Sequence, residues 1–172
     1  MKNIISLLIV LLPACASAQV AIGKPSVTNT SVSLEFGNGN RGMVLPWVTS
    51  AAAVTGAVNG TIVYDTSDKK VKVKYASGWK DLSVDTTGAV DTSLQDNRTE
   101  VATSKAEITT SGTVSTTPGI LVLADDNKAM VLPKVDSPHL NIISPAAGMM
   151  VYDTAKDLLA VFNGTVWSFW KP

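Results

Sequence analysis

The sequence contains very few of the residues from which active sites and metal centres are usually built. Among its 172 residues there is one cysteine, Cys15, and one histidine, His139. Zinc ligation by the usual cysteine and histidine set is therefore excluded, and a single histidine gives no basis for a Ser-His-Asp arrangement. His139 follows Pro138 and is interpreted as a solvated loop residue. We expect no catalytic residue, no metal site and no cofactor, and we do not expect an enzyme.

Charge is also scarce, and neither sign is in excess. Lysine and arginine total 14, aspartate and glutamate total 14, and only 16% of the residues are charged. Nucleic acid is not an expected partner, because no basic excess is present to neutralise phosphates. The abundant threonine, serine, valine and alanine favour short strands and turns over helices.

Long apolar stretches are missing as well. The run Ile4–Leu12 is too short to span a bilayer, and no other stretch predicts a transmembrane segment in the mature chain. With Lys2 before it and the small residues 16–18 after it, this run predicts a signal peptide over residues 1–18. The protein is then exported, to the periplasm, the outer cell surface or the medium.

A second reading of the same segment is a lipoprotein signal. Residues 12–15 (LPAC) would then make Cys15 the lipidated first residue, although Pro13 is unusual in that motif. Cleavage after Ala18 instead leaves a mature chain without cysteine and without disulfides.

The chain contains one sequence pattern that occurs twice. Residues 40–48 (NRGMVLPWV) match residues 127–135 (NKAMVLPKV) at an offset of 127 − 40 = 87. Residues 60–66 (GTIVYDT) match residues 148–154 (GMMVYDT) at an offset of 148 − 60 = 88. A repeat of this regularity predicts a duplicated structural unit.

Apolar and polar residues alternate within each copy, which predicts strands. In residues 31–36, valine, leucine and phenylalanine alternate with serine and glutamate, as in a half-buried strand. Val71, Val73 and Tyr75 alternate with lysines in the same way. Asp65 and Asp153 stand at matched turn positions, where their side chains are expected to cap the backbone.

We therefore predict a mainly β protein with two small repeats, each a short strand plus a three-stranded antiparallel meander. A Thr/Ser-rich segment joins them as a linker or stalk, and the heptad spacing of Leu94, Val101 and Ile108 allows a stalk helix. The predicted parts are a signal peptide (1–18), an N-terminal lead-in (19–30), the first β repeat (31–83), the linker or stalk (84–118) and the second β repeat (119–172).

Most residues shared by the two copies are predicted to be structural, because duplicated positions usually preserve packing. They are Leu45, Pro46, Tyr64, Trp79, Leu132, Pro133, Tyr152 and Trp167. Trp47 and Trp170 have no aromatic counterpart in the other copy, which makes them the candidate binding residues, for a sugar, another subunit or a partner protein. Burial against the repeat is the alternative for both.

The two copies resemble a repeat of exported cell-surface proteins of the Bacteroidetes. Its usual form is NKGLLLPRV, a variable loop and NPxxGMLVYDTTxxxLYVYNGTxW, which residues 40–79 and 127–167 follow. Trp47 and Lys134 depart from it, since they stand where arginine is usual. Similar segments occur in phage tail-fibre-like proteins, which are typically trimeric. The resemblance implies self-association, as a homo-oligomer and specifically a trimer, and a fibre-like role.

These observations predict a non-catalytic, exported structural or adhesive surface protein. The alternative is a glycan-binding accessory module that uses exposed tryptophans, with a surface glycan or another protein as its partner.

Overall fold

The computed structural model describes residues 18–93, 95–99, 101 and 103–171. In this part of the chain the protein is mainly β, which confirms the predicted fold class. Its helical elements are short: a 3-10 helix, η1 (Ala51–Ala53), and an α-helix, α2 (Pro138–Asn141). The predicted signal sequence up to residue 17, with Cys15, and the heptad position Leu94 lie outside the described residues.

The first meander sheet has the strand order β4-β5-β6-β7, with β4 parallel to β5 and the other pairs antiparallel. Its strands are β4 (Trp47–Val48), β5 (Ile62–Asp65), β6 (Lys70–Tyr75) and β7 (Gly78–Asp81). In β6, Val71 and Val73 are buried while Tyr75 is 42% exposed at the end of the strand, so the predicted alternation holds for the valines only.

The second meander sheet has the order β11-β12-β13-β14, again with one parallel pair followed by antiparallel pairs. Its strands are β11 (Lys134–Val135), β12 (Met149–Asp153), β13 (Leu158–Phe162) and β14 (Trp167–Trp170). The registers correspond, because Trp47 pairs with Tyr64 in the first sheet and Lys134 with Tyr152 in the second.

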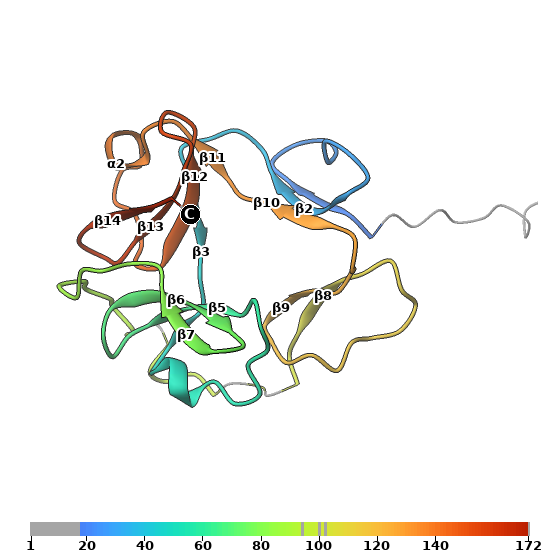
Figure 1. The fold of residues 1–172 in the computed structure, drawn as a ribbon, viewed down its shortest axis with the longest axis horizontal. Helices are drawn as coiled ribbons and strands as arrows, with labels where there is room; N and C mark the ends of the chain where they lie inside the picture. The colour runs from blue at the N-terminus through green and yellow to red at the C-terminus, as the bar shows by residue number, and fades with distance from the viewer. Residues whose placement is uncertain (1–17, 94, 100, 102, 172) are drawn as a thin grey trace, which may run out of the picture.

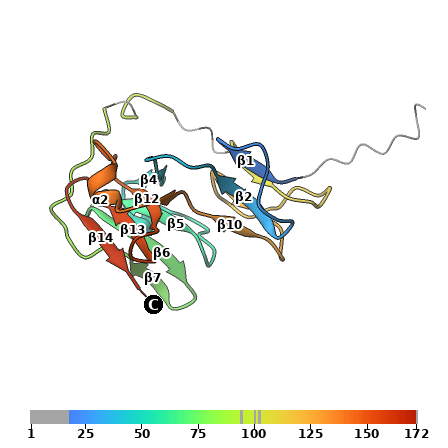
Figure 2. The same ribbon diagram turned by 90° about the horizontal axis from the view of Figure 1, so that it is seen from above.

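A third sheet is formed by β1 (Val20–Ile22), β2 (Val32–Phe36) and β10 (Ala129–Val131), with β1 and β10 both parallel to β2. A separate parallel pair joins β8 (Ala106–Ile108) to β9 (Leu121–Leu123). The meander sheets lie at one side of the molecule, and the third sheet with the β8–β9 pair lies at the other (Figures 1 and 2).

Two expectations for these outer strands were wrong. Strand β2 is buried on both faces, so Ser33 and Glu35 are 0% and 5% exposed rather than solvated. The loop after β1 covers the face that carries Glu35, because the Thr28 N–H and hydroxyl donate to its carboxylate and Lys24 Nζ lies 2.7 Å from Glu35 Oε1. A heptad seam does not reach Ile108, which lies in strand β8 rather than in a helix.

The two halves of the chain, β1–β7 and β8–β14, have corresponding internal pairings. Val20 is paired with Leu34 in the first half, and Ala106 with Leu121 in the second. Leu121 and Leu34 are separated by 121 − 34 = 87 residues, one of the two offsets found in the sequence. In the part of the chain that the structure describes, no helix has the length and apolar character needed to cross a membrane.

Candidate functional site

The two meander sheets contact each other through backbone pairing, side-chain hydrogen bonds and apolar packing. Strand β3 (Met43–Val44) pairs with β12 of the second half rather than with the first sheet, with Met43 opposite Met150. The Leu45 N–H continues this contact by donating to the Gly148 carbonyl at 3.0 Å. The two halves are therefore joined by backbone hydrogen bonds as well as by side-chain packing.

Close approach at this junction requires glycine at position 42. A Cβ at Gly42 would lie 2.4 Å from Cγ of Met149 and 2.7 Å from Cγ1 of Val151. Both distances are below any normal carbon–carbon contact, so β3 can approach β12 this closely only because no side chain intervenes.

Side chains of the first half also donate to backbone carbonyls of the second. The Trp47 indole Nε1 donates to the Ala147 carbonyl at 2.8 Å, and the Tyr64 hydroxyl donates to the Asn163 carbonyl at 2.7 Å. Burial, followed by the charges of Asp68 and Asp65, raises the pKa of the Tyr64 phenol, which keeps it a proton donor.

A shared apolar core fills the space between the sheets. Its buried members come from both halves of the chain, and they are Leu45, Tyr64, Val71, Val73, Leu82, Ala147, Met150 and Val161. Trp47, Ile62, Leu132 and Trp170 pack against this core while partly exposed. A smaller cluster behind it, around Val135, Ile142, Val151 and Ala160, includes Trp167 at its margin.

The segment predicted as linker or stalk, residues 84–118, contributes to the same junction. The Asn163 side-chain amide Nδ2 donates to the carbonyl and the Oδ1 of Asp85, at 3.1 and 2.8 Å. Side-chain hydrogen bonds from Thr87 and Asn163 lower the pKa of Asp85. A Cβ at Gly88 would lie 2.1 Å from the Asn163 carbonyl oxygen, so the start of this segment lies directly on the β13–β14 turn.

The predicted structural positions occupy different environments in the two halves. Leu45 and Tyr64 are buried at 6% and 0% exposure, whereas the matched Leu132 and Tyr152 are half-buried. The Tyr152 hydroxyl donates instead to Asp157 Oδ1 at 3.0 Å. The remaining predicted positions are buried Pro133 and half-buried Pro46, Trp79 and Trp167.

The two candidate binding tryptophans are not free aromatic platforms. Trp47 uses its indole N–H within the chain, and Trp170 packs against the shared core with Lys80 Nζ 5.5 Å from its ring centroid. Part of the Trp170 side chain remains exposed. His139 is exposed on α2, and its ring meets Phe169 edge-on at 5.6 Å.

The two matched aspartates cap the backbone, as the sequence predicted. Asp65 Oδ1 accepts from the Ser67 N–H at 2.9 Å, and Asp153 Oδ1 accepts from the Ala155 N–H at 2.8 Å. Burial alone would raise the pKa of Asp65, but hydrogen bonds from Ser67 and Ala51 outweigh it and lower the pKa. Both side chains are buried. Asp65 also accepts from the Ala51 N–H through Oδ2 at 2.8 Å, whereas Asp153 Oδ2 has no hydrogen-bond partner among the described residues.

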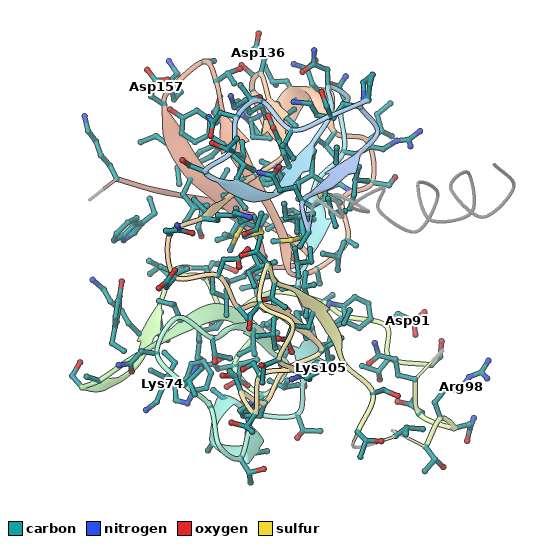
Figure 3. All side chains as sticks on the ribbon, turned by 90° about the vertical axis from the view of Figure 1, so that its right-hand side faces the viewer. Lys74, Asp91, Arg98, Lys105, Asp136 and Asp157 are labelled. Carbon is teal, nitrogen blue, oxygen red and sulfur yellow. The ribbon has the colours of Figure 1, made fainter. Side chains whose placement is uncertain are left out.

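Charged side chains of the first meander sheet form one cluster, in which Lys72 Nζ lies 2.5 Å from Asp68 Oδ2, 3.5 Å from Asp65 Oδ2 and 3.6 Å from Asp81 Oδ1. Figure 3 shows Asp136 and Asp157 on the second half, and Asp91 with Arg98 on a part of the chain that extends away from the sheets. Among the described residues no group of three or more His, Cys, Asp or Glu side chains is placed to hold a metal ion.

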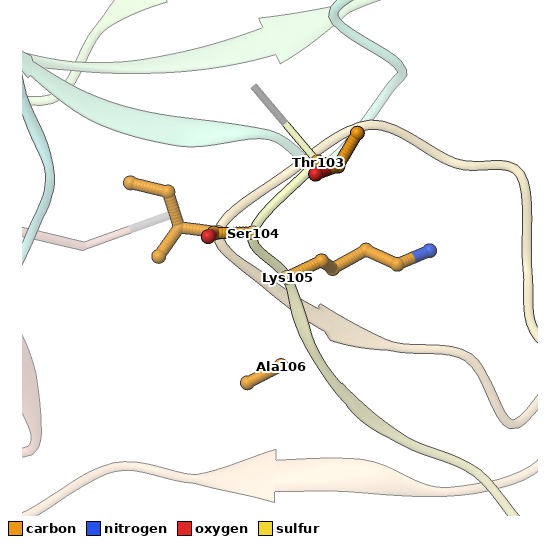
Figure 4. A pocket seen from close by; sticks show the side chains of 5 residues that line it. Thr103, Ser104, Lys105 and Ala106 are labelled. Carbon is orange, nitrogen blue, oxygen red and sulfur yellow. The ribbon is translucent and has the colours of Figure 1, made fainter. Parts of the chain in front are cut away.

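A shallow hollow beside strand β8 is lined by Thr103, Ser104, Lys105, Ala106 and Ile120 (Figure 4). Its one cation is already engaged, because Lys105 Nζ lies 3.0 Å from Glu107 Oε2 and donates to the Ser115 carbonyl. The hollow therefore lacks the paired groups of an acid–base or nucleophilic site, and its notable property is the exposed apolar wall formed by Ile120, at 60% exposure.

The roles of Asn163 and Asp85 were missed by sequence reasoning. Asn163-Gly164 reads as a hairpin signal, and nothing local indicates that its amide and carbonyl meet residues about a half-chain away. The partners differ by 78 and 99 residues in sequence, so only an alignment of covarying positions carries that information.

Comparison with known proteins gives one match. A family model described as a phage tail like trimerisation region matches residues 108–171, which run from the end of β8 to the end of the described chain. The searches of curated proteins and of solved structures found no match. The matched region supports self-association as a homo-oligomer and a fibre-like structural role, which agrees with the phage tail-fibre-like resemblance seen in the sequence.

Proposed function

We propose that this protein is a non-catalytic structural subunit that assembles as a homotrimer in a fibre-like structure on the cell surface. The observation that carries the proposal is the match of residues 108–171 to a trimerisation region. The site agrees with it, because the hydrogen bonds and packing at the junction of the two halves hold β sheets together.

We further propose that the two halves arose by duplication, as in the exported Bacteroidetes proteins that the sequence resembles. Corresponding strand pairings at offsets of 87 and 88 residues support this idea. Each meander is small, and a small sheet is seldom stable without a partner surface. A duplicated unit that packs on its own copy therefore favours an assembly built from many such units.

Export and adhesion are part of the same proposal. The Lys2 start, the apolar run Ile4–Leu12 and the small residues 16–18 support a signal peptide cleaved before Gln19. The alternative of lipid attachment at Cys15 predicts a heavier mature protein that stays with the membrane fraction. Intact mass and N-terminal sequence of the protein recovered from its native cells decide between these two forms.

Glycan binding is the weaker candidate. Its support is Trp170, which is partly exposed beside Lys80, because an aromatic face next to a polar group suits a sugar ring. Trp47 supports it less, because its indole N–H is already used by Ala147.

The trimer is tested by light scattering of the purified protein over a range of micromolar concentrations. The proposal predicts a mass three times that of the chain. A single-chain mass over the whole range would contradict it. Binding to a glycan array that is lost in Trp170→Ala, with the mass unchanged, would instead support the glycan-binding candidate.

A further inference from the structure

Two backbone pairings join the two halves of the chain. Strand β3 of the first half pairs with β12 of the second, and β10 of the second half pairs with β2 of the first. Strands β3 and β10 correspond to one another, since Met43 and Met130 are separated by 130 − 43 = 87 residues. Strands of this one type thus act as connectors: each pairs with an edge in the other half.

If the two halves were related by a two-fold axis, each of these pairings would occur twice. Strand β10 would pair with β5, as β3 pairs with β12. Strand β3 would pair with β9, as β10 pairs with β2. Neither pairing is present among the described strands. The contact is therefore heterologous, and a heterologous contact leaves one unpaired surface at each end unless further copies close it into a ring.

The first unfilled edge is the start of β5. Ile62 has the place in β5 that Met150 has in β12, since 150 − 62 = 88. Met150 lies opposite Met43 and is 1% exposed, whereas Ile62 has no strand beside it on that edge in the described chain and is half-buried. An apolar residue on an open strand edge is a ready template for pairing with another chain.

The second unfilled edge is β9. Leu34 in β2 is 2% exposed with β10 beside it, whereas the corresponding Leu121 in β9 is 46% exposed. Ile120 next to it forms the apolar wall of the hollow in Figure 4. The difference between Leu34 and Leu121 is the difference between a strand edge that has received a connector strand and one that has not.

The two open edges lie close to each other in the fold. A Cβ at Gly56, in the loop that leads to β5, would lie 3.3 Å from Cγ of Pro118, which precedes β9.

We propose that the edge of β5 at Ile62 accepts strand β10 (Ala129–Val131), and the edge of β9 at Leu121 accepts strand β3 (Met43–Val44), of another copy of this chain. The junction between the halves is the template, so the intermolecular contact repeats the β3–β12 and β10–β2 pairings. A homotrimer contains six halves, and a ring of these six halves gives every connector strand and every acceptor edge a partner. The inference rests on the proposed trimer and specifies which backbone edges hold it together.

The test is disulfide formation across the predicted pair in the full chain. In a Cys15→Ser background the introduced cysteines are the only thiols, because the chain has one cysteine. The test variant is Ile62→Cys with Met130→Cys, since Met130 has the place in β10 that Met43 has in β3. Directly opposed residues of an antiparallel pair have Cα atoms about 4.5–5.5 Å apart, which a disulfide spans. The positive control is Met43→Cys with Met150→Cys, the pair seen in the structure.

After mild oxidation we expect the Ile62→Cys, Met130→Cys variant to give covalently linked dimers and trimers on a denaturing gel. Each single-cysteine variant should remain a single chain, because in a heterologous contact a residue does not face its own copy. The inference is overturned if the Ile62→Cys, Met130→Cys variant does not link chains while the positive control oxidises. Light scattering of the unoxidised protein separates this inference from the proposed trimer. If the protein is a trimer but the cysteines do not link, the trimer stands and the proposed strand contacts are wrong.

A separate variant tests whether the edge of β9 takes part in the contact between chains. Leu121→Lys changes a side chain that is exposed within the chain, so the fold should remain and circular dichroism should be unchanged. We expect at least a tenfold weaker trimer, because a lysine on a strand edge opposes pairing. Val114→Lys, at a position 73% exposed in the loop before β9, is the matched control and should leave the trimer intact. Equal trimer stability in both variants would remove β9 from the interface.

Discussion

The hydroxyl of Tyr64 donates a hydrogen bond of 2.7 Å to the main-chain carbonyl of Asn163, across the junction of the two halves of the chain. Tyr64 is fully buried, and Asn163 is held in place by its own side-chain bonds to Asp85. The corresponding Tyr152 is half-buried and bonds only to Asp157 in its own turn. The same position of the repeat is thus buried at the junction in the first half and lies near the surface in the second half.

Replacing Tyr64 by phenylalanine should destabilise the protein more than the same change at Tyr152. Tyr64→Phe removes a buried donor and leaves the Asn163 carbonyl without it, which costs about 1–2 kcal/mol in the free energy of unfolding. Tyr152→Phe removes a bond to an exposed carboxylate and should cost less than about 0.5 kcal/mol. Urea unfolding followed by fluorescence measures both, and equal losses would show that the junction contributes little.

Methyl groups added at two glycines of the segment 84–118 should change the stability of the protein by very different amounts. Gly88→Ala would place its Cβ 2.1 Å from the Asn163 carbonyl oxygen, so the segment must move off the β13–β14 turn at a cost of about 1–3 kcal/mol. Gly112→Ala meets no atom within 4 Å and should change stability by less than about 0.5 kcal/mol. Thermal unfolding of the two variants is the comparison. If Gly88→Ala is as stable as wild type, the segment does not rest on the turn in solution.

Acid should weaken the third sheet through Glu35. The ion pair with Lys24 and hydrogen bonds from Thr28 lower the pKa of Glu35 from 4.5 to about 2. A carboxylate with a lowered pKa contributes its full stabilisation above the unfolded pKa and loses it as pH falls from about 4.5 toward about 2. Glu35→Gln should flatten the fall of unfolding free energy over this window and leave the profile above pH 5 parallel to wild type.

Lys24→Gln is the matched variant for that experiment, because it removes the partner and keeps the carboxyl group. It should flatten the same pH window by a smaller amount, since the Thr28 hydroxyl and N–H still bond to Glu35 at 2.6 Å. Unfolding profiles of both variants that match wild type between pH 5 and pH 2 would refute a stabilising role for the ion pair.

The sequence predicted the parts of this fold that depend on local pattern. Alternation at Val71 and Val73, the turns at Asp65 and Asp153, and the spacing of the repeat predict the antiparallel meanders found in the structure. These features are local, because the partner strands are separated by short turns.

The parallel pairings could not be predicted from local pattern. Strand β10 joins β2 across about half of the chain, and no turn residue or periodicity marks such a contact. Trp47 was a candidate for an exposed binding residue, but its indole N–H meets a carbonyl 100 residues away. The side chain of Glu35 alternates as a solvent-facing residue would, and it is buried because Lys24 and Thr28 of the loop after β1 cover it.

The most direct test of the trimer is the mass of the native assembly. Sedimentation equilibrium of the purified wild-type protein should give three times the mass of its single chain from low to high micromolar concentration. A single-chain mass throughout, or a mass of two chains, would contradict the account.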